Sequence, residues 1–102
     1  MTHNLLRGLR ATHPGELLRE DVLPALRATK AQIARDLRVS RQQLYDILNE
    51  KKPVTPQMAL RLAKLLGTSA ESWLRMQQAY DLAMQAPAMA EELEHIPTLQ
   101  AA

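Results

Sequence analysis

The chain has 102 residues, 46% of them hydrophobic, a formal net charge of +2 and no cysteine. This length suits one compact domain with a core, and the lack of cysteine excludes disulfide frameworks, thiolate zinc sites and cysteine nucleophiles. No run of eighteen apolar residues occurs and the first twelve residues lack a signal-peptide pattern, so we expect a cytoplasmic protein without a membrane span.

The small net charge conceals an uneven distribution along the chain. Residues 27–52 carry seven Lys and Arg against three acidic residues, whereas residues 70–102 carry one Arg against five acidic residues. A basic middle and an acidic end indicate one surface that faces a polyanion and a separate surface for something else.

The hydrophobic residues are mainly Leu, Ala, Ile, Val and Met, with no Phe, one Trp and two Tyr. Because these are helix formers, an all-α fold is expected. Residues 1–12 are predicted to be an N-terminal arm. Pro14 suits a first helical turn, and Pro24 is expected to end that helix, which predicts a helix over 14–23 and a connector over 24–28.

Two short helices are predicted next, over residues 30–37 and 41–49. Thr29 and Ser40 are good N-caps for them, and apolar residues then recur at helical spacing. Only Arg38 and Val39 separate the two helical patterns. This arrangement of two short helices around a tight turn is typical of a helix-turn-helix.

Two further helices complete the predicted domain, which spans residues 13–85. Thr55 and Pro56 form a cap and first-turn pair for a helix that ends at Gly67. A fifth helix follows and reaches about residue 85. Its cap is either Thr68, which can form a capping box with Glu71, or Ser69. Residues 86–102 are expected to be a C-terminal tail, either a short helix or a frayed segment.

The second helix of the pair is expected to read DNA. Leu44, Ile47 and Leu48 share its inward face, so its other residues point outward. The major groove suits an Arg for guanine and a Gln for adenine, and both types stand in the first turn of this helix. The predicted base-reading residues are Arg41, Gln42, Tyr45 and Asp46.

Polar and basic residues around this face are expected to contact phosphates, which set register and supply salt-dependent affinity. They are Lys30, Ser40, Gln43, Asn49, Lys51 and Lys52.

Two of the base-reading positions remain open in their role. Asp46 could accept from a cytosine amino group, pair with Arg41 or Arg35, or weaken non-specific binding. Tyr45 could contact a phosphate or a thymine methyl group, or pack at the edge of the domain.

The stretch TKAQIARDLRVSRQQLYDILN, residues 29–49, resembles the helix-turn-helix of lambda-repressor-like domains. Ala34 stands at the close approach of the two helices, Val39 in the turn, and Leu44 and Ile47 as the inward pair. Arg38 stands where such motifs usually have glycine. Because the turn residue commonly has a positive φ, a non-glycine residue there is expected to cost on the order of 1 kcal/mol.

A closer resemblance, to the HigA/VapI family of antitoxins, covers about residues 13–83. It rests on His-Pro-Gly-Glu at 13–16, Thr-Pro-x-Met-Ala at 55–59 and Trp-Leu-x-Met-Gln-x-x-Tyr-Asp-Leu at 73–82. The resemblance implies a homodimer that represses its own operon by binding the promoter. It also implies that the protein binds and neutralises a HigB-type, ribosome-dependent mRNA endonuclease.

The fifth helix carries one apolar face, made by Trp73, Met76, Tyr80 and Met84. Such a face is more often core or dimer interface than a ligand site. We expect Trp73 in the core and the distal part of the helix to pair two protomers. A dimer would present two recognition helices about 34 Å apart and would therefore bind an inverted-repeat operator.

Other functions are less well supported by the sequence. Histidines occur only at 3, 13 and 95, without a nucleophile, a Gly-rich phosphate loop or metal-ligand spacing, so neither an enzyme nor a cofactor is expected. A stand-alone regulator without a toxin partner would show the same DNA-reading features, and a protein-binding adaptor is a third possibility. A toxin could contact the first helix and N-terminal segment, or the acidic tail.

Overall fold

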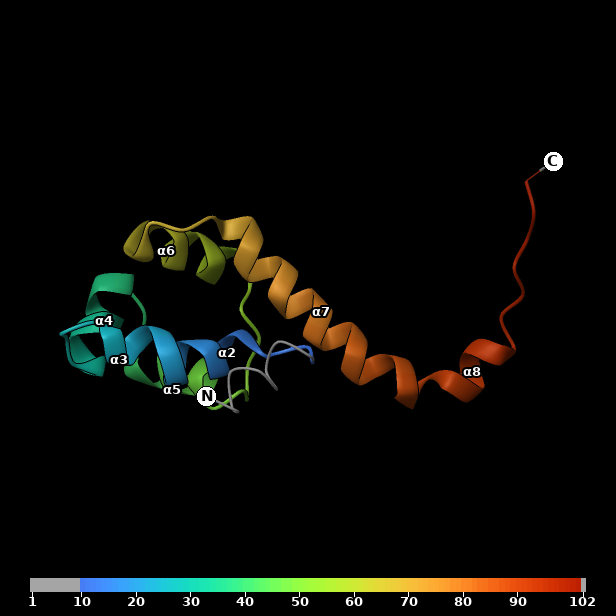
Figure 1. Ribbon diagram of the computed structural model, residues 1–102, viewed down its shortest axis with the longest axis horizontal. Helices are drawn as coiled ribbons and strands as arrows, with labels where there is room; N and C mark the ends of the chain where they lie inside the picture. Colours follow the sequence, from blue (N-terminus) through green and yellow to red (C-terminus); the bar gives the residue numbers. More distant parts are fainter. Residues whose placement is uncertain (1–9, 102) are drawn as a thin grey trace.

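The computed structural model describes residues 10–101, and within them all regular structure is helical (Figure 1). The predicted all-α class is therefore confirmed. Residues 1–9, most of the predicted N-terminal arm, lie outside the described residues. The elements are α2 (Pro14–Leu17), η1 (Leu18–Val22), α3 (Leu23–Ala25), α4 (Lys30–Leu37), α5 (Arg41–Leu48), α6 (Pro56–Leu66), α7 (Ala70–Ala88) and α8 (Ala90–Glu94).

The first helical stretch is longer than expected, and the prediction that it stops before Pro24 is wrong. Pro24 lies inside α3, which continues directly from the π-helical segment η1. There the N–H of Leu23 bonds to the carbonyl of Leu18, five residues back. The wider π turn relieves the crowding between a proline ring and the preceding turn, so the chain leaves the helix only at Leu26.

The helix-turn-helix pair begins where the sequence predicts. Thr29 caps α4, its side chain accepting from the N–H of Gln32. Ser40 caps α5 in a complete capping box: its hydroxyl accepts from the N–H of Gln43, and the Gln43 side chain accepts from the N–H of Ser40. This reciprocal pair satisfies two backbone donors at the start of α5.

Three helices end in the same way, with a residue in the left-handed conformation. Arg38 after α4, Glu50 after α5 and Gly67 after α6 have φ values of 62°, 61° and 69°. After α4, Val39 N–H bonds to the Ala34 carbonyl, the longer bond of a Schellman cap. The positive φ expected at position 38 is confirmed, and Arg38 and Glu50 hold without glycine a conformation that favours it.

One hydrophobic core holds these helices together. Its members come from every helix from η1 to α7, and α6 packs along the start of α7. Full burial of a Leu side chain stabilises the fold by about 1.5–3 kcal/mol. The buried apolar residues are Leu18, Leu23, Ile33, Ala34, Leu37, Leu44, Ile47, Leu48, Val54, Met58, Ala59, Leu62 and Trp73.

The start of α7 resolves the choice of cap left open by the sequence. Ser69 is the N-cap, and its hydroxyl accepts from the N–H of Ser72. Thr68 instead accepts from the indole N–H of Trp73 at 2.8 Å. A buried tryptophan needs such an acceptor, so the Thr68 hydroxyl serves the core.

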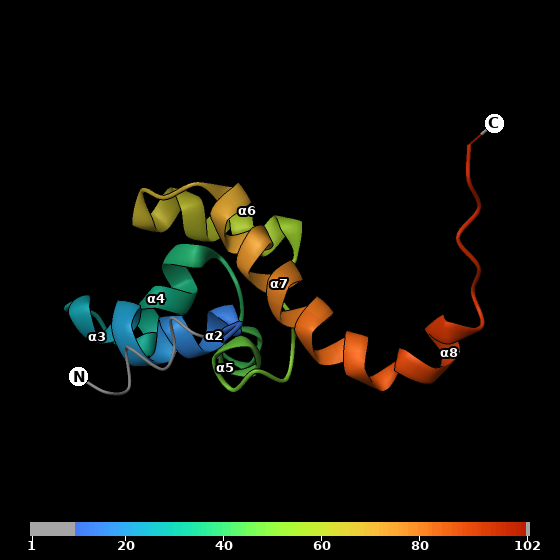
Figure 2. The same cartoon turned by 45° about the vertical axis from the view of Figure 1, so that its right-hand side comes forward.

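The C-terminal part of the chain leaves the body of the molecule (Figures 1 and 2). Helix α7 extends to Ala88, three residues past the predicted end, with Pro87 in its last turn. The tail then forms the short helix α8, one of the two alternatives considered above. Every residue from 81 to 101 is exposed. Among the helices of residues 10–101, none is both long and apolar enough to cross a membrane.

Candidate nucleic-acid interface

Helix α5 has two opposite faces. The anchors Leu44, Ile47 and Leu48 are between 2% and 4% exposed, and they fix the helix to the body. Arg41 and Gln42 are exposed on the other side, so the inward and outward faces fall where the sequence predicts. The exposed first turn of α5 is the part of a recognition helix that reaches base edges.

Asp46, half-buried on α5, has a partner that was not expected from the sequence. Its Oδ1 accepts from Nε2 of Gln42 at 2.7 Å, one helical turn away. The carboxylate therefore orients the amide of Gln42. One Nε2 hydrogen and Oε1 remain for a ligand, and these are the donor and acceptor that match adenine in the major groove.

Tyr45 connects the recognition helix to the first helix of the motif. Its ring lies under the ammonium group of Lys30, with 5.7 Å between Nζ and the ring centroid. Tyr45 is 38% exposed, so the pair lies at the surface. A cation–π contact of this kind is worth roughly 0.5–1 kcal/mol at an exposed site, and it holds Lys30 beside the outward face of α5.

The residues predicted to contact phosphates are all exposed. Ser40 and Gln43 are tied to each other by the capping box, yet the Ser40 hydroxyl hydrogen and the Gln43 Nε2 remain available as donors. A shallow hollow brings Gln43 and Lys52 together with Thr55. Asn49 and Lys51 lie in the loop between α5 and α6, next to Lys52.

The C-terminal end of α5 is held by a residue far away in the chain. Arg19 of η1 donates from Nη1 to the carbonyl of Leu48 at 2.6 Å and pairs with Glu50 at 3.3 Å. An arginine is favourable there because the last carbonyls of a helix carry partial negative charge. The sequence did not predict this contact, since 29 residues separate its partners.

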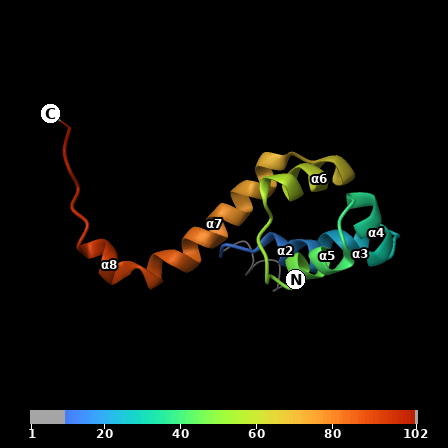
Figure 3. The same ribbon diagram turned by 180° about the vertical axis from the view of Figure 1, so that it is seen from behind.

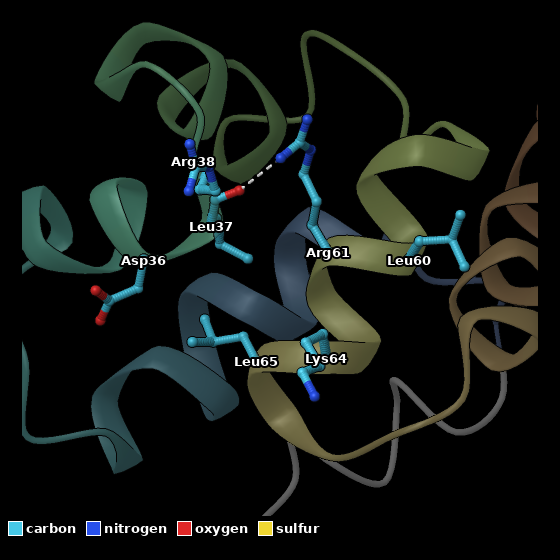
Figure 4. Close-up of a pocket in the computed structure, with 7 residues that line it drawn as sticks. All are labelled: Asp36, Leu37, Arg38, Leu60, Arg61, Lys64 and Leu65. Carbon is cyan, nitrogen blue, oxygen red and sulfur yellow. Dashed lines mark hydrogen bonds between the residues drawn. The ribbon is translucent and has the colours of Figure 1, made fainter.

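Helix α4 is held in a similar way at its own C-terminal end. Arg61 of α6 donates from Nη1 to the carbonyl of Leu37 at 3.0 Å, across a groove between α4 and α6 (Figure 4). Each helix of the helix-turn-helix thus ends against an arginine from a neighbouring element. The two helices cannot rotate relative to the body without breaking these bonds.

The His-Pro-Gly-Glu segment at the start of α2 packs against the end of α5. A side chain at Gly15 would place its Cβ 1.8 Å from the carbonyl oxygen of Ile47, so only glycine fits this close approach. His13 is buried and caps α2, its Nδ1 accepting from the N–H of Gly15 at 2.9 Å. Tyr80 of α7 packs edge-on against the His13 ring, with centroids 5.0 Å apart.

Burial lowers the pKa of His13 below its ordinary value of 6.5. The carboxylates of Glu50 and Asp81 and a hydrogen bond to the Lys52 backbone act in the opposite direction, while Arg19 adds to the lowering. His13 is therefore a neutral, structural residue at neutral pH, which agrees with its role as a cap.

The residues predicted for the fifth helix occupy different environments on α7. Trp73 is 4% exposed in the core, Met76 and Tyr80 are half-buried, and Met84 is 59% exposed beyond the body. Gln77, which the sequence analysis gave only as part of the 73–82 motif and without a role, is the buried polar residue of this helix.

Comparison with known proteins identifies the motif. The Helix-turn-helix family model matches residues 25–73. Virulence-associated protein I of Dichelobacter nodosus is 43% identical over 74 residues, which cover 72% of this chain and 68% of that protein. The chain belongs to the HigA/VapI family of helix-turn-helix antitoxins.

Two solved structures of this family share the fold over all or nearly all of their length. Antitoxin HigA of Pseudomonas aeruginosa, solved with the higBA promoter, is 37% identical, with a TM-score of 0.81 over 89% of this chain and 100% of that one. Antitoxin GraA in complex with its operator is 36% identical, with a TM-score of 0.82 over 90% and 94% of the two chains. The lambda-repressor-like fold expected from residues 29–49 is thereby confirmed.

Proposed function

We propose that this HigA/VapI family member is a dimeric repressor that binds the operator of its own operon and neutralises a HigB-type mRNA-cleaving toxin. The observation that carries the DNA-binding part is the exposed polar face of α5, opposite three buried anchors. The operator and promoter complexes of the related antitoxins GraA and HigA support the same assignment.

In this proposal α5 enters the major groove and its first turn faces the bases. Arg41 would pair with a guanine, and Gln42, oriented by Asp46, with an adenine. Tyr45 would lie at the edge of this contact with Lys30. The phosphate contacts would come from Lys30, Ser40, Gln43, Asn49, Lys51 and Lys52.

The proposed DNA-binding domain spans residues 13–85, and the distal part of α7 would pair two copies. Leu82 and Met84, on opposite sides of α7, are 70% and 59% exposed there, and Met89 and Leu93 add apolar side chains beyond it. A two-fold axis near this surface would set two α5 helices about 34 Å apart, one turn of B-DNA, and would require an inverted-repeat operator.

The toxin partner is the part of the proposal carried by family membership. An RNA-cutting protein is expected to be basic, and the exposed acidic residues Glu91, Glu92 and Glu94 of α8 would complement it. The first helix and the N-terminal segment are the second candidate surface. The protein would act in the cytoplasm, where both its DNA and its toxin are found.

The DNA-binding part is tested by titrating promoter DNA of the operon with the protein over a range of salt concentrations. We expect a dimer to bind an inverted repeat with a log–log salt slope of about −0.9 for each phosphate contact, and scrambled DNA to bind more weakly. Equal affinity for promoter and scrambled DNA would contradict operator recognition.

The antitoxin part needs a separate experiment. The chain is co-expressed with the gene adjacent to its own, and growth is compared with expression of that gene alone. Relief of growth arrest is the expected result. A neighbour that does not arrest growth would leave a stand-alone regulator as the better description.

A further inference from the structure

The loop between α5 and α6, residues 49–55, is here called the lysine loop because it carries Lys51 and Lys52. Both lysines are exposed, whereas Val54, two residues later, is 2% exposed in the core. Figure 3 shows the loop passing beside α7 on its way to α6. Because the end of the loop at Val54 is buried, the contacts of that end set the geometry of the loop.

The buried end of the lysine loop, at Val54, is held by Gln77 of α7. The N–H of Val54 donates to Oε1 of Gln77 at 2.8 Å, and this bond is buried. On the other side Nε2 of Gln77 donates to Oδ1 of Asp81 at 2.9 Å. Since Gln77 is only 4% exposed, its amide cannot exchange these partners for water without opening the site.

Two further contacts fix the same loop from the first helix. His13, packed against Tyr80, lines one hollow with Lys52 and Gln77. Arg19 pairs with Glu50 and holds the carbonyl of Leu48 just before the loop. The loop is thus held by bonds from η1 and α7, and its two exposed lysines stand on a backbone that these bonds fix.

We propose that Gln77 is a positioning residue for DNA binding, which holds the lysine loop so that Lys51 and Lys52 meet the phosphate backbone without further ordering. This inference rests on the proposed operator binding. Ordering a long side chain or a loop on binding lowers affinity, and a loop fixed beforehand avoids that loss. Because α7 also carries the proposed dimer surface, Gln77 connects the pairing helix to the DNA-contacting loop.

The first test uses the free protein and does not depend on DNA. Amide hydrogen exchange is compared between wild type, Gln77→Leu and the double variant Gln77→Glu with Asp81→Asn. In the double variant a Glu oxygen can still accept from Val54, an Asn amide can donate back to the Glu, and the net charge is unchanged. Wild type and the double variant should protect the amides of Lys51, Lys52 and Val54, and Gln77→Leu should expose them while α4 and α6 stay protected.

The second test measures operator affinity against salt. Gln77→Leu should weaken binding by about tenfold, and it should lower the steepness of the log–log salt dependence by about two, one for each lysine. The double variant should restore both quantities. A residue that merely stabilised the fold would lower the melting temperature and leave the salt slope of the folded protein unchanged.

A double-mutant cycle links Gln77 to the two lysines. If the loop is already misplaced in Gln77→Leu, then adding Lys51→Ala and Lys52→Ala should cost much less affinity than the same pair costs in wild type. Unchanged loop exchange in Gln77→Leu, or strictly additive effects on affinity, would overturn the proposal. Failure of wild type to bind promoter DNA would instead refute the proposed function, and the exchange data would still decide whether Gln77 fixes the loop.

Discussion

The body of the protein, residues 13–77, and its C-terminal arm, residues 81–101, differ in how far their apolar side chains are buried within the chain. In residues 13–77 the helices share one core, and each helix of the helix-turn-helix ends against an arginine from another element. In residues 81–101 every residue is exposed, including the large apolar side chains of Leu82, Met84 and Leu93. The body is therefore complete as a single chain, whereas the arm has an apolar surface that a partner chain would cover.

The largest effect is expected at Gly15, where α2 meets α5. Replacing Gly15 with Ala would put a methyl group against the Ile47 carbonyl, and the helices would have to separate. We expect the free energy of unfolding to fall by about 3 kcal/mol or more, measured by urea denaturation. A loss below about 1 kcal/mol would show that the two helices are not pressed together here.

The arm should respond in the opposite way, with little change in folding and a large change in assembly. Leu82→Ser combined with Met84→Ser should raise the dimer dissociation constant by about 100-fold, because the two side chains lie on opposite sides of α7 and the variant removes whichever one the partner covers. Sedimentation velocity measures this. Leu60→Ser is the matched control, since Leu60 is similarly exposed on α6.

Equal dissociation constants for the Leu82/Met84 variant and wild type would show that the distal part of α7 is not the dimer surface. A large loss of helix in that variant would show that the arm contributes to the body after all.

A smaller effect, this time stabilising, is expected in the turn of the motif. Arg38 has a φ of 62° and would be relieved by glycine. Arg38→Gly should raise the stability of the isolated protein by about 1 kcal/mol, seen as a higher midpoint in urea. An unchanged or lower midpoint would mean that contacts of the Arg38 side chain offset its backbone strain.

The smallest predicted effect is a dependence on pH. Because the pKa of His13 is lowered in the folded protein, protonation favours unfolding, so the His13 contribution to stability is present above pH 6.5 and is lost as the pH falls through the lowered value. His13→Asn keeps an N-cap acceptor without titrating. Its stability should therefore decrease less than that of wild type between pH 7 and pH 5, whereas parallel curves would contradict the role of His13.

Local patterns were enough to predict most of the body. Caps at Thr29, Ser40 and Thr55, with apolar residues at helical spacing, located α4, α5 and α6 to within one residue. Pro24 does not end the first helix because a π turn precedes it, and no simple spacing rule predicts such a turn from the sequence.

The site was predictable only in part, for a related reason. The two faces of α5 follow from periodicity, but the residues that hold it come from far away in the chain. Arg19 is 29 residues from Leu48, and its sequence context is that of an ordinary exposed arginine. Gln77 did leave a signal, since it stands four residues after Trp73 on the same face of α7, where a polar residue is buried only with partners.

The central claim is that the outward face of α5 reads DNA, and operator affinity of Arg41→Ala tests it most directly, with Arg75→Ala on α7 as a control of equal charge. We expect Arg41→Ala to weaken operator binding by about 1–3 kcal/mol and to relax preference at one base pair, while Arg75→Ala binds like wild type. Equal binding by wild type and Arg41→Ala would contradict it.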